Sequence, residues 1–103
     1  MVTRLIWDEA KRKANLANHG LDFADAVWVL ESRYRLDILS VRDGEARMQS
    51  LSYVVDRLAV LSLVHLPRED AARIVSFRHA SERESETYHE WIAQEASDPE
   101  GDP

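Results

Sequence analysis

The chain has 103 residues, with 13 Lys and Arg, 19 Asp and Glu and no cysteine, and its formal net charge is −6. This length fits one domain with its own hydrophobic core, and the lack of cysteine excludes disulfides, thiolate nucleophiles and cysteine-based zinc sites. The longest strongly apolar stretch, Leu58 to Val64, is too short to cross a bilayer, and Asp8 and Glu9 interrupt the segment where a signal peptide would be apolar. We therefore expect a soluble, cytoplasmic protein.

The acidity is concentrated at the carboxyl end of the chain. Residues 84–103 contain seven acidic residues and no Lys or Arg, so residues 1–83 have a net charge of +1. A local basic face is therefore compatible with the composition, although no run of Lys and Arg marks one. The sequence SDPEGDP at residues 97–103 is typical of a disordered acidic tail, and we expect the folded domain to span residues 1–96.

The amino-terminal part predicts one strand and two helices. TRLIW, at residues 3–7, favours a short strand. Asp8 is suited to cap a helix that Gly20 ends, because glycine adopts the left-handed conformation at low cost. Asp22 is suited to cap a second helix, in which apolar residues recur at helical spacing: Phe23, Ala26, Val27 and Leu30.

The middle of the chain predicts strands. Asp43 and Gly44 are a hairpin signal between strands at residues 38–41 and 47–55. Turns at residues 56–57 and 67–70 then enclose a strand at residues 58–66 and precede a last strand at residues 73–79. In that last strand apolar and polar residues alternate, so Arg78 should point away from Phe77. These segments predict an antiparallel meander.

A carboxy-terminal helix is predicted by Ser81 and Glu84, which form a capping box, and by the apolar stripe of Tyr88, Trp91 and Ile92. The order of one strand, two helices, several strands and a helix favours a single-domain α+β layer fold.

A spaced series of residues runs through most of the chain. It begins in IWDEAKRKANLANHGLDFADA with Trp7, Asp8, Lys11, Asn15, His19, Gly20, Phe23 and Ala26. It continues in DGEAR at residues 43–47, in LVH at residues 63–65 and in RIVSFRHASERE at residues 73–84. The series resembles the BrnT family of type II toxins, over roughly residues 4–91. The resemblance implies a RelE-like fold, metal-independent RNA cleavage without a cofactor, and pairing with a small DNA-binding, BrnA-like antitoxin that alone contacts DNA.

In such cleavage the ribose 2′-hydroxyl attacks the adjacent phosphorus, so cations must hold the phosphate while its charge rearranges. Arginine suits this role because its planar, permanently charged fork can meet two phosphate oxygens. The candidates are Arg47, Arg78 and Arg83. Arg78 could equally be a solvated residue or the partner of a carboxylate such as Glu84. Arg83 lies in the first helical turn, where the helix dipole disfavours a cation, and a functional role or an ion pair would explain it.

Histidine suits proton transfer because its ordinary pKa lies near neutrality. His65, at the end of an apolar strand, is a catalytic candidate, although a partly buried structural histidine would fit the same position. His79 and Lys11 are candidates for RNA contacts. The four histidines show no metal-ligand spacing, so we expect no metal site.

Two other functions remain open. The chain could be a catalytically silent, toxin-like binding module that acts through its antitoxin complex in operon autoregulation. It could also be a small α+β protein with an unrelated partner.

Overall fold

A computed structural model describes residues 4–96, so the expected acidic tail at residues 97–103 and Thr3 of the first expected strand lie outside the described residues. Within residues 4–96, five strands and three α-helices follow one another, with two 3₁₀ turns, η1 and η2, between them. In chain order they are β1 (Arg4–Ile6), α1 (Glu9–His19), η1 (Phe23–Ala26), α2 (Val27–Leu30), β2 (Leu36–Arg42), β3 (Glu45–Val54), η2 (Val55–Arg57), β4 (Ala59–Pro67), β5 (Ala71–His79) and α3 (Glu82–Ala96).

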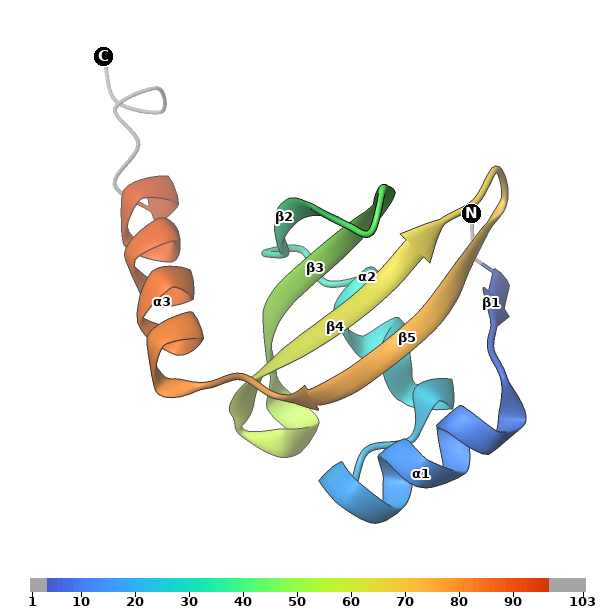
Figure 1. Ribbon diagram of the computed structural model, residues 1–103. Coiled ribbons are helices and arrows are strands. Elements are labelled where there is room, and N and C mark those ends of the chain that lie inside the picture. The colour runs from blue at the N-terminus through green and yellow to red at the C-terminus, as the bar shows by residue number, and fades with distance from the viewer. Residues whose placement is uncertain (1–3, 97–103) are drawn as a thin grey trace.

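The five strands form one sheet in the order β1-β5-β4-β3-β2 (Figure 1). Strands β2 to β5 are a continuous antiparallel meander, and β1 joins the edge of β5 in parallel. The predicted α+β class and the meander are therefore confirmed.

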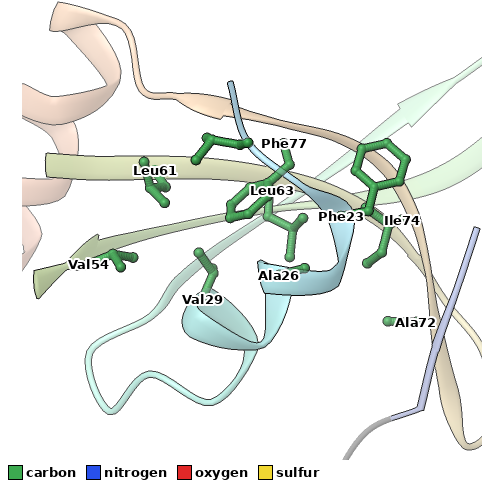
Figure 2. Packing of buried hydrophobic residues seen from close by; sticks show 10 residues of the cluster. Phe23, Ala26, Val29, Val54, Leu61, Leu63, Ala72, Ile74 and Phe77 are labelled. Carbon is green, nitrogen blue, oxygen red and sulfur yellow. The ribbon is translucent and has the colours of Figure 1, made fainter. Parts of the chain in front are cut away.

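One face of the sheet carries the main hydrophobic core, and we call it the core face. Leu61, Leu63 and Phe77 lie on it, fully buried against Phe23 of η1 and Val29 of α2 (Figure 2). Burying large apolar side chains is the dominant stabilising term for such a domain. The opposite face, which we call the open face, is covered by α3 only in part.

Helix α3 packs against one end of the open face. Its Tyr88 is buried with Leu51 of β3 and Val60 of β4, and the Tyr88 hydroxyl donates a hydrogen bond to the Tyr34 carbonyl at 2.7 Å. Trp91 and Ile92 pack against the same cluster, so the predicted apolar stripe does face the sheet. Among residues 4–96 no helix is long and apolar enough to cross a membrane.

Local signals position several of these elements as predicted. The Asp8 carboxylate accepts a hydrogen bond from the Ala10 N–H at 2.9 Å, and Gly20 ends α1 at φ 72°. Asp43 and Gly44 both have positive φ, 54° and 78°, as a two-residue hairpin turn with a right-handed twist requires. Ser81 and Glu84 form the capping box that begins α3, with reciprocal hydrogen bonds of 2.8 and 3.1 Å.

The predicted second helix is present at residues 23–30, but it is not one continuous α-helix. Asp22 does cap the segment, but a 3₁₀ turn follows and then a single α-helical turn. The buried residues Phe23, Ala26 and Val29 recur at a spacing of three, which matches the three residues per turn of a 3₁₀ helix better than an α-helix. Packing beneath the sheet therefore sets the local geometry.

The boundary between the third and fourth strands was placed wrongly. Val55 is not in a strand but begins η2, and Leu58 has φ 51°, in the left-handed region. A residue with that backbone conformation cannot start a strand, so β4 begins at Ala59. Since Leu58 is also 76% exposed, its apolar side chain was no guide to its position.

Helix α1 is tied to the sheet by the buried Asn15. Its carboxamide donates to the Phe77 carbonyl at 2.7 Å and to the Leu21 carbonyl at 3.0 Å, and accepts from the Phe77 N–H at 3.1 Å. Asn15 thus pairs with both backbone groups of Phe77 as a neighbouring strand would, which satisfies polar groups that would otherwise be buried without partners.

Candidate nucleic-acid interface

A hollow of about 420 Å³ opens on the part of the open face that α3 leaves uncovered. Three arginines from three different strands line it: Arg42 of β2, Arg47 of β3 and Arg78 of β5. The other side chains that line the hollow are uncharged: Ser40, Gln49, Val64, Val75 and Ser76. No aromatic side chain of the described residues lines the hollow, so its chemistry suits an anion better than a stacked base.

Strand register explains why these side chains gather. Residues directly opposite each other in antiparallel strands point to the same face. Ser40 of β2 lies opposite Arg47 of β3. In β4, Val64 is paired with Gln49 on one side and with Ser76 on the other. Ser62, also in β4, is paired in the same way with Leu51 and Arg78. All of these side chains therefore share the open face. A β-bulge between Val64 and His65 adds Val75 to the same surface.

Arg47 is a cation of the hollow with little compensation from carboxylates. Its Nε atom is buried and has no hydrogen-bond partner among the described residues. Its nearest carboxylate is that of Glu45, where Nη2 and Oε1 are 4.0 Å apart. A buried guanidinium N–H without an acceptor costs free energy, while the charge of the Arg47 guanidinium can still attract an anion in the hollow.

Arg78, in contrast, is paired with Glu84. Its Nη1 and Nη2 atoms donate to the two carboxylate oxygens at 2.8 and 3.0 Å, and about a third of its side chain is exposed. Hydrogen bonds from Arg78, then from the Ser81 N–H and Gln49, lower the pKa of Glu84 to about 2 against the opposing effect of burial. The same ion pair raises the pKa of Arg78. The carboxylate partner anticipated for Arg78 is thus present at the rim of the hollow.

His65 lies on the core face, not in the hollow. It is opposite Met48 and Ile74, is only 4% exposed, and its Nε2 atom is 3.0 Å from the Ser50 hydroxyl. Burial, and then the nearby Arg35, lower its pKa, although Asp37 opposes this shift. Its Nδ1 atom has no partner among the described residues. This environment is that of a neutral, buried histidine.

Three other candidates are also separate from the hollow. Arg83 lines a different depression along α3, together with Glu82, Glu86, Thr87 and Glu90. Lys11 is exposed on α1, which lies along the β5 edge. His79 is exposed at the end of β5, and its register opposite Leu61 places it on the side of the core face.

Arg42 was not among the candidates from the sequence. A signal for it was present, because the two-residue turn at Asp43 and Gly44 fixes the pairing of Arg42 with Glu45 and of Ser40 with Arg47. Alternation then places Arg42 two residues beyond Ser40 on the same face. The strand alternation of Leu61, Leu63 and His65 likewise indicated that His65 faces the core.

Among residues 4–96 no group of three or more His, Asp or Glu side chains is arranged to hold a metal ion. The arrangement can nevertheless hold an anion through guanidinium groups, which is a chemistry shared by phosphate-binding sites in general.

Comparison with known protein families gives one match that covers most of the chain. A family described as the ribonuclease toxin, BrnT, of a type II toxin-antitoxin system matches residues 7–84. Comparison with curated proteins gives no match. The matched range includes β2 to β5, with the three arginines of the hollow, and ends at Glu84.

Proposed function

Because the chain belongs to the BrnT family of ribonuclease toxins of type II toxin-antitoxin systems, we propose that it is an endoribonuclease that inhibits translation and growth by cleaving RNA at the hollow. The observation that carries the proposal is the convergence of Arg42, Arg47 and Arg78 on one concavity. A phosphate of an RNA strand supplies acceptors of the right charge and geometry.

The proposed reaction is an attack of the ribose 2′-hydroxyl oxygen on the adjacent phosphorus. It forms a 2′,3′-cyclic phosphate and breaks the bond to the 5′-oxygen of the next nucleotide, while the 2′-hydroxyl proton passes through solvent to that departing oxygen. Negative charge builds up on the phosphate oxygens during this attack. Arginines fixed on the rigid strands β3 and β5 can stabilise that charge without large reorganisation. Because this stabilisation comes from guanidinium groups, we propose that cleavage needs no metal, and a chelator should leave its rate unchanged.

The proposal includes a RelE-like fold and a cytoplasmic site of action. Its support is the order of elements, with helical segments before a mainly antiparallel meander and a helix after it. The type II family implies an antitoxin partner. We propose that this partner is a small DNA-binding, BrnA-like protein that covers the cationic hollow by charge complementarity, so that the toxin meets DNA only through it.

The test is to induce the protein in cells without its partner, and to follow growth and RNA integrity together. We expect growth arrest, with RNA fragments that end in 2′,3′-cyclic phosphates. A family member known to be active serves as a parallel control. If the protein is folded and abundant while growth continues and RNA stays intact, the enzymatic proposal fails.

One observation favours a second candidate, a catalytically silent module that acts through its antitoxin complex. Arg78 is already neutralised by Glu84, so the hollow holds less net positive charge than its three arginines suggest. Under this alternative the protein would bind the antitoxin and repress their shared operon, yet no RNA would be cleaved at any concentration of pure protein.

A further inference from the structure

We propose that Glu84 is a positioning residue of this site, because its carboxylate fixes one edge of the Arg78 guanidinium and leaves the other edge available to the scissile phosphate. This inference rests on the proposed function. It adds a residue of α3 to a site that otherwise consists of strand residues.

The Glu84 carboxylate is held from three directions. Oε1 accepts from Arg78 Nη1 and from the Ser81 N–H, both at 2.8 Å. Oε2 accepts from Arg78 Nη2 at 3.0 Å and from Gln49 Nε2 at 2.8 Å. Gln49 in turn donates to the Ser62 hydroxyl at 2.9 Å. The carboxylate therefore has little freedom, and it connects β3, β5 and the first turn of α3.

Arg78 keeps donors that this network does not use. A guanidinium has five N–H groups. Nη1 donates to Glu84 and, at 3.1 Å, to the His79 carbonyl, while Nη2 makes one bond to Glu84. The Nε–H and the second Nη2–H have no partner among the described residues. These two lie on the edge of the guanidinium that Glu84 does not contact, and together they form a fork that suits two phosphate oxygens.

The charge of Glu84 has a second effect. In the free protein it compensates the charge of Arg78, so it opposes binding of a phosphate in the ground state. During attack the phosphate gains negative charge, and an oriented guanidinium then stabilises it more strongly than before. Substitution of such a residue should therefore strengthen RNA binding and slow cleavage at the same time. Substitution of a residue that only caps the helix would not change affinity and rate in opposite directions.

The experiment compares Glu84→Gln with a matched control, Glu82→Gln. Both substitutions remove one negative charge from the first turn of α3, but Glu82 lines the separate depression and has no hydrogen bond or ion pair with Arg78. For each protein we would measure the affinity for a single-stranded RNA over a range of salt concentrations, the single-turnover cleavage rate at saturation, and folding by circular dichroism.

For Glu84→Gln we expect RNA to bind several-fold more tightly, because a repulsive charge is lost and the charge of Arg78 is no longer compensated when it meets the phosphate. The plot of log affinity against log salt should become steeper by about 0.7, the value of one additional uncompensated positive charge on a single strand. The cleavage rate should fall at least tenfold, because Arg78 is no longer held in place. Glu82→Gln should match the wild type in both measurements.

A folded Glu84→Gln protein that binds and cleaves like the wild type would overturn the inference. So would equal changes in Glu84→Gln and Glu82→Gln, which would indicate a general charge effect, or a loss of both affinity and rate in proportion to unfolding. A wild-type protein that neither binds nor cleaves RNA would overturn the proposed function itself, and this inference with it. Wild-type cleavage with an unaltered Glu84→Gln variant would overturn the inference alone.

Discussion

The role of a residue in this protein depends on the face of the sheet on which its side chain lies. Arg47 and Arg78 lie on the open face at the hollow, whereas His65 is buried on the core face beside Ser50. Ser50 also donates a 2.6 Å hydrogen bond to Asp37, which is paired with Arg35. His65 therefore belongs to a polar network that runs from the buried Ser50 to the surface at Asp37, and we expect it to affect stability rather than cleavage.

We predict that His65 makes the protein less stable at mildly acidic pH. Its pKa is lowered by burial, so below about pH 6.5 the unfolded chain binds more protons than the folded one. The stabilising contribution is thus complete above that pH and is lost as the pH falls. Urea unfolding between pH 5 and 8 should show this decline, and His65→Gln should flatten it.

The exposed His89 provides the matched control for this measurement, since His89→Gln removes a surface imidazole of α3 and leaves the hydrogen bond between His65 and Ser50 in place. A wild-type protein whose free energy of unfolding does not change over this pH range would contradict the role of His65.

Residue roles were only partly predictable from the sequence. An ion pair of Arg78 with a carboxylate such as Glu84 was one of the alternatives that the sequence left open, and the structure contains it. The separation of Arg83 from the hollow follows from helical periodicity. Tyr88 and Ile92 point to the sheet from the same stripe as Glu84, while Arg83 is one position away from that stripe and lies along a different side.

At the level of elements, short capping signals predicted the boundaries of helices better than long patterns of apolar residues did. Asp8, Gly20 and the capping box at Ser81 act over a few residues, and each element boundary that they indicated is present. The second helix and the start of β4 depended instead on packing beneath the sheet and on the left-handed conformation of Leu58. Such tertiary effects override local propensity, so a pattern of apolar residues did not reveal them.

Helix α1 offers the clearest test at this scale. We predict that Asn15→Ala lowers the free energy of unfolding by about 3 kcal/mol, because the backbone groups of Phe77 and the Leu21 carbonyl lose their buried partner. Urea denaturation followed by circular dichroism measures the loss. Asn18→Ala, in the same helix but exposed, is the control and should change stability by less than about 0.5 kcal/mol. Equal effects of the two substitutions would contradict the docking role of Asn15.

For the whole molecule, the distribution of charge matters more than its sum. The net charge of −6 would argue against an RNA-binding protein, yet seven of the acidic residues lie in residues 84–103, and three arginines converge on the hollow. The sheet brings together side chains that are up to 36 positions apart, Arg42 and Arg78. This convergence was not evident from local composition, because it depends on the pairing of four strands.

The most direct test of the proposed site is cleavage of a single-stranded RNA by pure wild-type protein and by Arg47→Ala, Arg78→Ala and Arg68→Ala. Arg68 is exposed in the turn between β4 and β5, so its loss controls for a change in net charge. We predict that Arg47→Ala and Arg78→Ala, while still folded, lose about 100-fold or more in rate, and that Arg68→Ala stays close to the wild type. Folded Arg47→Ala and Arg78→Ala proteins with full activity would contradict the assignment of the hollow as the site of RNA cleavage.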